Sequence, residues 1–385
     1  MRLLVIHNTL WAHYKSLLFR KLSEQTATSD TLLVIQIALT EGHRKGLGVP
    51  DASVVGYPFT LLHNGPLEAV SLPARIRGLL THGLAFKPDV VLLTGYYDPA
   101  QLLLGLVLKL KGCRVVLQSE STSLDNPRTG WREQIKRGFV KLCDGYFCFG
   151  TRAADYLIQL GATPSRILVR NNAVVDNAGL RATYLAALTN RENELKARQL
   201  PPKSLIYVGR LIPIKNLTSL IDAFCEACRA NPTANWGLIL LGEGEQKTIL
   251  QEQVNALKMN DKVRFLPGCN WQDVPRFLAL ANALVLPSQS EPWGLVVNEA
   301  MACGLPVLVS DRCGCVDDLV RDGQNGYRFN PNQPDQLTDQ IGKLLRSTPA
   351  DLTRMGTESA WIVEAFNPDS VGKAMYDALV HLSKH

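Results

Sequence analysis

Two glutamates with seven residues between them are the strongest chemical signal in the sequence. A predicted loop ends at Gly294, where an apolar helix opens with Leu295 and Val296. Glu291 precedes this helix, and Glu299 lies just over one turn inside it. The first amides of a helix have no partner inside it and carry the positive end of its dipole, so they suit a phosphate group. Each carboxylate matches two neighbouring sugar hydroxyls. The pattern predicts a receptor for ribose, diphosphate and sugar; ordinary solvated acids are the alternative.

Two cations, Arg210 and Lys215, follow the carboxyl end of another predicted strand. A diphosphate that leaves during a transfer reaction gains negative charge, and fixed cations stabilise that transition state. Surface charges without a role are the alternative. The sequence contains no Asp-x-Asp, so it gives no sign of a metal ion that bridges a diphosphate.

The composition is typical of a globular protein, with 385 residues of which 46% are hydrophobic and 20% charged. This length predicts two domains. No apolar run approaches the roughly 20 residues that span a bilayer, and residues 1–7 predict a strand rather than a signal peptide. The nine cysteines are scattered, and no second pair completes the metal-like spacing of Cys225 and Cys228, which indicates reduced thiols. We therefore expect a cytoplasmic protein.

The charge is uneven along the chain. Residues 1–190 contain 21 Lys and Arg against 13 Asp and Glu, a net charge of +8, whereas the remainder has a net charge of −2. A basic first half can meet an anionic partner, such as a lipid diphosphate or the inner face of a membrane, or it can be an ordinary solvated surface. Nucleic acid is the weakest partner, because no recognised nucleic-acid-binding module accompanies the charge.

Short apolar runs alternate with longer helical segments, which predicts strands buried on both faces of parallel sheets. The predicted strands are Leu3–Ile6, Leu32–Ile37, Val90–Leu93, Val115–Leu117, Tyr146–Phe149, Ile167–Val169, Leu205–Val208, Gly237–Leu241, Val263–Leu266, Ala283–Leu286, Pro306–Val309 and Tyr327–Phe329. A polar segment at about 176–204 predicts the interdomain connection. We expect an α/β protein with two Rossmann-like doubly wound domains that face each other across a cleft. We place them at residues 1–180 and 181–364, with a C-terminal helix at 365–385 that packs back on the first domain.

Several motifs stand in the order typical of one family. They are the two glutamates followed by Ala300-Met301-Ala302-Cys303-Gly304-Leu305-Pro306-Val307, and also Val208-Gly209-Arg210-Leu211, Leu241-Gly242-Glu243-Gly244, Phe265-Leu266-Pro267-Gly268 and Asp322-Gly323-Gln324-Asn325-Gly326-Tyr327. Over about residues 200–345 the chain closely resembles the family 4 retaining glycosyltransferases of the GT-B fold. The first half is more weakly similar to members that build bacterial polysaccharides or glycolipids.

The resemblance implies a role for each matching residue of the second half. Glu299 would hydrogen-bond the ribose hydroxyls of a nucleotide sugar, and Glu291 would contact the hydroxyls of the transferred sugar. Arg210 and Lys215 would neutralise the diphosphate. Backbone around the helix start and the glycine motifs would complete the donor site: Gly294, Leu295, Val296, Gly209, Gly242, Gly268 and Cys269. The resemblance also implies catalysis without a metal or another cofactor.

Two departures from the family pattern lie in the first half. The segment after the first strand lacks the Gly-Gly pair that many relatives carry there, and its His13 is the candidate residue on the acceptor side. After the predicted strand Val115–Leu117, many members have a histidine that approaches the sugar, whereas this chain has Gln118-Ser119-Glu120-Ser121. Glu120 is a candidate partner for the acceptor or the reacting sugar; a structural hydrogen-bonding role is the alternative.

The sequence therefore predicts a retaining hexosyltransferase that uses a UDP- or GDP-linked sugar and a hydroxyl of a glycan or lipid-linked acceptor. A nucleotide-sugar epimerase of the same fold and a non-catalytic sugar-nucleotide binding protein are the alternatives. A dinucleotide-dependent oxidoreductase is disfavoured, because no G-x-G-x-x-G follows the first strand, where Ile6-His7-Asn8-Thr9-Leu10 stands instead.

Overall fold

The computed structural model describes residues 1–10, 12–26, 29–42, 55–124 and 130–384. Internal contacts divide the chain into two compact units. The first unit holds Met1–Val175 together with Phe366–His385, and the second holds Asp176–Ala365. The chain therefore passes from the first unit to the second and back.

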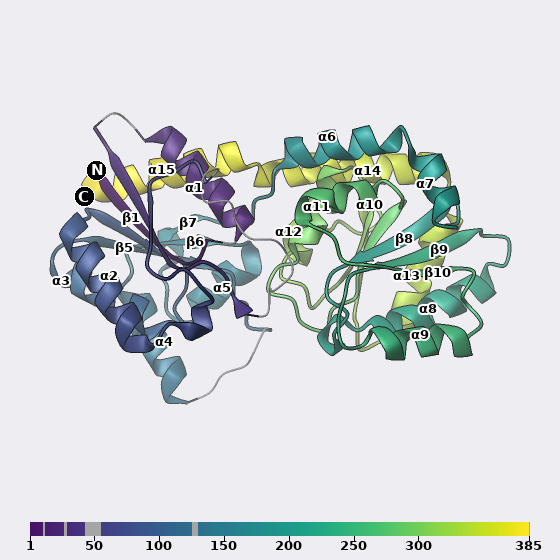
Figure 1. Ribbon diagram of the computed structural model, residues 1–385, viewed down its shortest axis with the longest axis horizontal. Helices are drawn as coiled ribbons and strands as arrows, with labels where there is room; N and C mark the ends of the chain where they lie inside the picture. The colour runs from purple at the N-terminus through teal and green to yellow at the C-terminus, as the bar shows by residue number, and fades with distance from the viewer. Residues whose placement is uncertain (11, 27–28, 43–54, 125–129, 385) are drawn as a thin grey trace. The chain divides into compact units, whose positions relative to one another are not determined.

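The first unit is built on a seven-stranded parallel sheet in the order β3-β2-β1-β4-β5-β6-β7 (Figure 1). Its strands are β1 (Arg2–Thr9), β2 (Thr31–Ala38), β3 (Phe59–Leu61), β4 (Val90–Leu93), β5 (Arg114–Ser119), β6 (Gly145–Cys148) and β7 (Ile167–Val169). The chain winds outwards from β1 in both directions, which makes the sheet doubly wound. The side chains of β4 are wholly buried, as expected for a strand covered on both faces.

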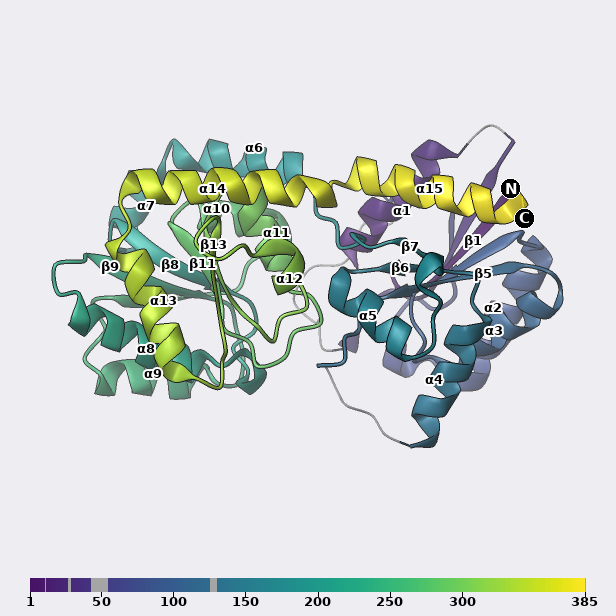
Figure 2. The same cartoon turned by 180° about the vertical axis from the view of Figure 1, so that it is seen from behind.

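Helices cover both faces of this sheet (Figures 1 and 2). One face carries α2 (Leu72–Phe86), α3 (Pro99–Leu110), α4 (Trp131–Leu142) and α5 (Thr151–Gln159), and the other carries α1 (His13–Gln25) and α15 (Pro368–Lys384). The last helix, α15, buries Val371, Met375 and Leu379 against α1 and the sheet. Asp30 ties both ends of the chain to this unit, because its carboxylate accepts hydrogen bonds from the Met1 amino group at 2.7 Å and the Tyr376 hydroxyl at 2.6 Å.

The second unit has a six-stranded parallel sheet in the order β10-β9-β8-β11-β12-β13. Its strands are β8 (Lys203–Val208), β9 (Trp236–Leu241), β10 (Val263–Leu266), β11 (Ala283–Leu286), β12 (Val307–Ser310) and β13 (Gly326–Phe329). Its helices are α6 (Asn177–Leu188), α7 (Arg191–Ala197), α8 (Leu217–Ala230), α9 (Lys247–Ala256), α10 (Val274–Leu278), α11 (Leu295–Ala302), α12 (Val316–Leu319), α13 (Pro334–Arg346) and α14 (Pro349–Val363). The direction of winding reverses between β8 and β11.

The predicted fold class is confirmed, since both units are Rossmann-like α/β units with parallel sheets. All twelve predicted strands are present, with ends shifted by at most three residues. The structure adds β3, a three-residue edge strand whose side chains are only half-buried, so it lacks the apolar run of a central strand. The segment predicted as the connection, residues 176–204, contains α6 and α7, which belong to the second unit and bury Leu180, Tyr184 and Leu195.

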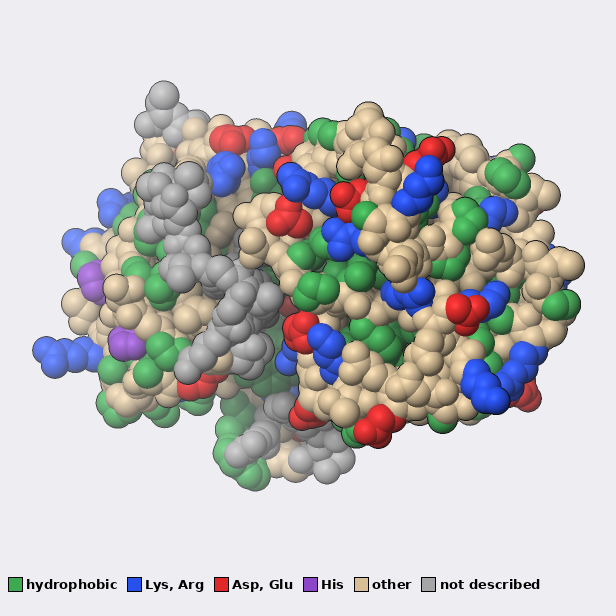
Figure 3. Space-filling view, turned by 45° about the vertical axis from the view of Figure 1, so that its right-hand side comes forward, with side chains coloured by type: hydrophobic (Ala, Val, Ile, Leu, Met, Phe, Trp, Pro, Cys, Tyr) green, Lys and Arg blue, Asp and Glu red, His purple; other side chains and the backbone are tan. Residues whose placement is uncertain are grey.

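The surface of the second unit carries both signs of charge. In Figure 3 its Lys and Arg side chains are interspersed with Asp and Glu rather than gathered into one patch. This agrees with the small net charge of the second half of the chain. Across the described ranges, no helix combines the length and the apolar character needed to cross a membrane.

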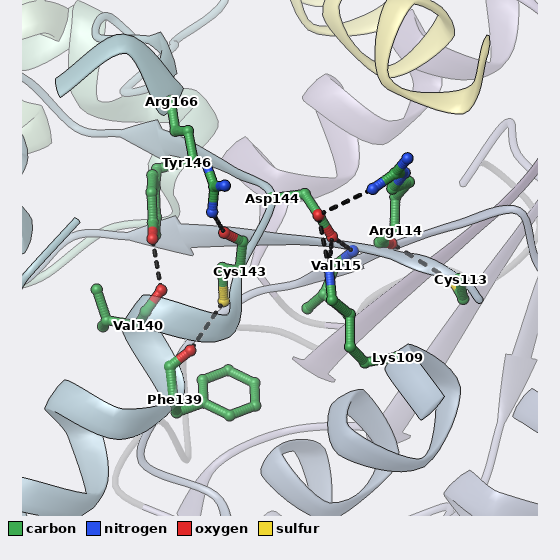
Figure 4. Close-up of polar contacts among 10 residues, drawn as sticks. All are labelled: Lys109, Cys113, Arg114, Val115, Phe139, Val140, Cys143, Asp144, Tyr146 and Arg166. Carbon is green, nitrogen blue, oxygen red and sulfur yellow. Dashed lines mark hydrogen bonds and ion pairs between the residues drawn. The ribbon is translucent and has the colours of Figure 1, made fainter. Parts of the chain in front are cut away.

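Asp144, between α4 and β6, joins three elements of the first unit (Figure 4). Its carboxylate accepts hydrogen bonds from Lys109 Nζ of α3 at 2.6 Å and from the Val115 amide of β5 at 2.8 Å, and Arg114 donates a third at 3.3 Å. Burial raises the pKa of this carboxyl, but the bonds from Lys109 and Val115 outweigh burial and hold its pKa below the ordinary value of 3.8.

We predict that Asp144→Asn lowers the free energy of unfolding of the first unit by about 1–2 kcal/mol at pH 7, because the amide keeps the bond from Val115 and loses the charge. Because the folded pKa is lowered, the carboxylate's contribution is present above the ordinary value of 3.8 and is lost as the pH falls through the folded pKa. Urea unfolding at several pH values measures the difference, which should shrink on acidification. Asp377→Asn, which removes an exposed pair with Lys373, is the control. An equal loss at every pH would contradict the prediction.

Candidate functional site

The second unit brings the predicted donor residues to the carboxyl edge of its sheet. Arg210 and Lys215 follow β8, and Glu291 and Glu299 follow β11, which lies next to β8. The winding reverses between these two strands, and ligands of doubly wound sheets bind in the crevice at that point. Residues separated in the sequence by the whole of β9 and β10 thus become neighbours.

A left-handed glycine starts the helix between the two glutamates. Gly294 has a φ of +98°, and a Cβ there would lie 2.8 Å from Leu286 Cδ2, so a side chain would be strained. The buried indole of Trp293 donates a hydrogen bond from Nε1 to Asn298 Oδ1 at 2.8 Å, which fastens the loop to α11. Gly294, Leu295 and Val296 are half-buried residues. The Trp293–Asn298 bond therefore fixes the loop at the point where α11 begins.

An ion pair joins the loops after β8 and β11. Lys215 ends the 3-10 turn Pro213–Lys215, and its Nζ contacts Glu291 Oε2. Their side chains are only 14% and 18% exposed. A hydrogen bond also joins the two loops: the Gln289 backbone amide donates to the Ile214 carbonyl at 2.9 Å. The residues predicted to meet diphosphate and sugar therefore also neutralise each other.

Arg210 has an exposed side chain that forms no hydrogen bond or ion pair within the described part of the chain. Its backbone is fixed, because its carbonyl accepts a hydrogen bond from the Tyr207 hydroxyl at 2.7 Å. Tyr207 is buried, and burial together with the nearby charge of Glu291 raises the pKa of its phenol. The Arg210 guanidinium is thus anchored at its base and available to an anion.

The three glycine turns meet at the same edge of the sheet. The Gly209 amide donates to the Leu241 carbonyl at 3.0 Å, and the Gly242 amide donates to the Leu266 carbonyl at 3.1 Å. Gly242 has a φ of +151°, and a Cβ on it would overlap the Gly209 carbonyl oxygen. A Cβ on Gly268 would lie 3.9 Å from the Gly242 Cα. The loops after β8, β9 and β10 therefore pack backbone against backbone.

Glu299 has a carboxyl group that stands alone. Within the described ranges it forms no hydrogen bond or ion pair, although it is partly enclosed, and burial by itself raises its pKa to about 7. Cys269 lies close by: burial raises the pKa of its thiol to about 11, and the charges of Asp273 and Glu299 add to the rise. An enclosed carboxyl without a partner suits a ligand that donates hydrogen bonds.

A cavity of about 630 Å³ opens beside Cys269, between α6, α7 and α10. Its charged lining consists of Glu194, Arg198, Asp273 and Arg276. Of the predicted site residues, Cys269 alone lines it, so the cavity adjoins the glycine turns rather than the two glutamates.

The remaining two predicted residues belong to the first unit. Glu120 follows β5, and its Oε1 lies 2.6 Å from Lys15 Nζ. Lys15 is almost wholly buried and lies 4.3 Å from the centre of the Phe149 ring. Burial lowers the pKa of this amine, and the charge of Glu120 opposes the shift. Lys15 was not among the predicted site residues, although it lies two positions after His13, whose side chain is outside the described residues.

Metal binding has no visible support among the described residues, where no three His, Cys, Asp or Glu are grouped so as to hold an ion. All nine cysteines are free, and all except Cys269 are buried. Burial raises the pKa of the Cys143 and Cys303 thiols to about 12. Such thiols are protonated at neutral pH and act as small apolar side chains.

Comparison with known proteins identifies the segment that carries this site. Residues 190–360 match the family model of glycosyl transferases group 1. This segment is therefore similar to glycosyl transferases of group 1. It contains β8 to β13 and every predicted donor residue.

Curated glycosyltransferases are similar to parts of the chain. The chain is 30% identical to a D-inositol 3-phosphate glycosyltransferase of Streptomyces bingchenggensis over 263 residues, which are 66% of this chain and 56% of that protein. It is 29% identical to an uncharacterized glycosyltransferase of Haemophilus influenzae over 176 residues, 46% of this chain and 48% of that protein. The chain thus spans about half the length of the curated relatives it matches.

Solved structures extend the likeness beyond residues 190–360. Anabaena HepE in complex with UDP and glucose has a TM-score of 0.74 at 18% identity, over 99% of this chain and 100% of that one. An E. coli structure, described as trehalose-6-phosphate bound with UDP-2-fluoro glucose, has a TM-score of 0.74 at 11% identity, over 100% and 99%. These identities show the fold, which is GT-B.

We predict that Glu299→Gln stabilises the unliganded protein above pH 7. The folded pKa of about 7 lies above the ordinary value of 4.5, so ionisation of this group disfavours the folded state. The gain should grow from pH 4.5 to pH 7 and then level off. We expect roughly 1–3 kcal/mol, towards the lower end because the side chain keeps some contact with water.

Thermal unfolding of the variant and the original protein at pH 5 and pH 8 measures this gain. Glu252→Gln, at an exposed position of α9, is the control and should change stability little at either pH. A loss of stability by Glu299→Gln at pH 8 would show that the carboxylate has a partner in the free protein.

Proposed function

We propose that the chain is a retaining hexosyltransferase that moves a sugar from a nucleoside diphosphate hexose to a hydroxyl of a glycan or lipid-linked acceptor. The observation that carries the proposal is one sheet edge that holds the partnerless Glu299 carboxyl, the fixed start of α11 and the Lys215–Glu291 pair. The group 1 match supports the same reaction class. HepE, which has a similar fold, has been solved with UDP, with UDP and glucose, and with UDP-glucose. UDP-glucose is therefore the first donor to test, and GDP-linked sugars follow.

Each group at the edge has a separate task in this proposal. Glu299 accepts hydrogen bonds from the ribose hydroxyls. The amides of Leu295 and Val296 bind the distal phosphate, because they are unpaired inside α11 and lie at the positive end of its dipole. Arg210 and Lys215 stabilise the charge that builds up on the leaving diphosphate, and Glu291 contacts hydroxyls of the transferred sugar.

The Lys215–Glu291 pair can persist while the donor is bound. An ammonium group has three donors and a carboxylate has two acceptor oxygens, so each partner can hold the other and still contact the ligand. The pair would then place the Lys215 ammonium, which binds phosphate, directly beside the Glu291 carboxylate, which binds sugar hydroxyls. This arrangement fits the point of a nucleotide sugar where the hexose joins the diphosphate.

The proposed reaction breaks the bond between the anomeric carbon and the diphosphate oxygen. The acceptor hydroxyl forms the new bond on the same face of the sugar, and its proton passes to the leaving phosphate. Positive charge from Arg210, Lys215 and the start of α11 neutralises the leaving group, so the proposal includes no metal ion. Glu120, ion-paired with Lys15, is the proposed partner for the acceptor or the reacting sugar.

We predict that Glu291→Gln and Glu299→Gln separate catalysis from binding. Glu291→Gln should lower the transfer rate about 100-fold or more, because it weakens contacts that orient the sugar and the Lys215 charge, while UDP affinity changes less than about fivefold. Glu299→Gln should weaken UDP binding about 10- to 100-fold, because a charged acceptor of ribose hydroxyls is lost. Calorimetric titration with UDP and turnover of UDP-glucose with candidate acceptors measure the two effects.

Glu252→Gln is again the matched control, and it should leave both binding and turnover unchanged. Nuclear magnetic resonance of the product tests retention of the anomeric configuration. Turnover of the donor alone to an isomeric sugar nucleotide would indicate an epimerase, and UDP binding without any turnover would indicate a non-catalytic binding protein. If both glutamate variants transferred sugar at the rate of the original protein, the site assignment would be wrong.

A further inference from the structure

A buried lysine and a partly exposed glutamate form an ion pair in the first unit. Lys15 lies in the first turn of α1, and its Nζ is 2.6 Å from Oε1 of Glu120, which follows β5. The Lys15 side chain is 3% exposed, whereas that of Glu120 is 38% exposed. Within the described ranges, Glu120 forms no other ion pair. Its carboxylate is therefore held on one side and accessible on the other.

The position of Lys15 is unfavourable for a charged amine in two respects. Burial removes water from the ammonium group and lowers its pKa, and the charge of Glu120 opposes this shift. The first turn of α1 also lies at the positive end of the helix dipole, where a cation is disfavoured. Two aromatic rings compensate in part, since Nζ lies 4.3 Å from the centre of the Phe149 ring and 5.5 Å from that of the Tyr14 ring. Neither the helix nor the core gains from a charge here, which points to a role for the pair itself.

Hydrogen bonds hold the chain in place on both sides of Glu120. The Phe149 amide donates to the Ser119 carbonyl at 3.1 Å, which joins the ends of β5 and β6. On the other side of Glu120, the hydroxyl groups of Ser121 and Tyr97 form a hydrogen bond of 3.0 Å. The freedom left to Glu120 is mainly that of its own side chain, and the ion pair restricts it.

Another buried lysine of the first unit provides a comparison. Lys136 of α4 lies 3.2 Å from Glu133 of the same helix, and their side chains are 6% and 13% exposed. The Lys136 ammonium also donates to the Tyr156 hydroxyl at 3.3 Å. Both members of this pair are enclosed, and both belong to one helix. The Lys15–Glu120 pair differs, because it joins α1 to the end of β5 and leaves its acidic member accessible.

The placement of the Lys15–Glu120 pair favours a role in orientation over a role in stability. Apolar side chains of similar volume often stabilise a protein as well as a buried ion pair does, so the pair is weak evidence for a stabilising contact. Glu120 directly follows the carboxyl end of β5, and doubly wound sheets bind their ligands at the carboxyl ends of the strands. A carboxylate accepts hydrogen bonds from hydroxyl groups through both of its oxygens. The pair thus fixes the charge and the direction of a group that can bind hydroxyls.

We propose that Lys15 is a positioning residue, which holds the Glu120 carboxylate in one orientation so that it binds and orients hydroxyl groups of the acceptor. Orientation of this kind affects the rate strongly, because a small misplacement of a reacting molecule lowers the fraction of productive encounters. Lys15 is buried and acts only through Glu120. The inference rests on the proposed transfer reaction and adds to it the residue on which Glu120 depends.

Steady-state kinetics of the full chain with UDP-glucose as donor and octyl glycosides as acceptors tests the inference. Lys15→Met, which has a similar volume and no charge, should lower kcat at least about tenfold, because Glu120 is no longer held. The affinity for UDP should change less than about twofold, since the proposed donor residues lie in the second unit. Glu120→Gln should lower kcat by a similar or larger factor. The double variant should be no slower than Glu120→Gln alone, because both changes disable the same contact.

Two further variants separate positioning from stability. Lys136→Met is the matched control, because it removes another buried lysine of the same unit together with its ion pair. Thermal unfolding should show a loss of stability in both lysine variants, whereas only Lys15→Met should lose turnover. The exchanged pair, Lys15→Glu with Glu120→Lys, restores an ion pair and replaces the accessible carboxylate by an ammonium group. It should stay as slow as Glu120→Gln, and it keeps the test available if Lys15→Met does not fold.

Three results would overturn the inference alone. Lys15→Met could turn over as fast as Lys136→Met, the losses from Lys15→Met and Glu120→Gln could multiply in the double variant, or the exchanged pair could recover the original rate. In each case the original protein still transfers sugar, so the proposed function stands. Absence of transfer by the original protein from every nucleotide sugar tested would instead overturn the proposed function, and the positioning role with it.

Discussion

The ion pair between Lys215 and Glu291 lies where the winding of the second sheet reverses, and the site depends on that position. Parallel strands bring their carboxyl ends to one edge regardless of the sequence between them, so β8 and β11 present their loops side by side. The pair then fixes one loop against the other. Because both side chains are largely shielded from water, salt screens their attraction only weakly, and removing one partner would leave the other charge uncompensated.

Several groups around this pair lower the stability of the free protein and can interact with a ligand. Glu299 is partly enclosed and has no partner among the described residues, and Gly242 and Gly294 hold positive-φ backbone conformations that a side chain would strain. Groups of this kind weaken the free protein, and a bound ligand can repay the loss by satisfying them. The buried Trp293–Asn298 hydrogen bond works in the opposite sense, since it stiffens the loop at the helix start.

Much of this arrangement could be predicted from the sequence, and the exceptions have physical reasons. Continuous apolar runs mark central parallel strands, whereas β3 is short and half-exposed and leaves no such run. Glu299 stands out because a charge interrupts an apolar helix. The contact between Lys215 and Glu291 depends on the order of strands in the sheet, which spacing along the chain does not reveal. The burial of Lys15 likewise depends on Phe149 and Glu120, which follow two other strands.

The return of α15 to the first unit has a consequence for the order of events during synthesis. The second unit is one continuous segment and can assemble as soon as residue 365 has left the ribosome. The first unit cannot, because Val371, Met375 and Leu379 complete one face of its core and are made after the second unit. Its α1 face, with Leu18 and Phe19, must wait uncovered while the middle of the chain is translated. The usual order, in which the N-terminal domain matures first, is therefore inverted, and chaperones that shield nascent apolar surface have a defined target.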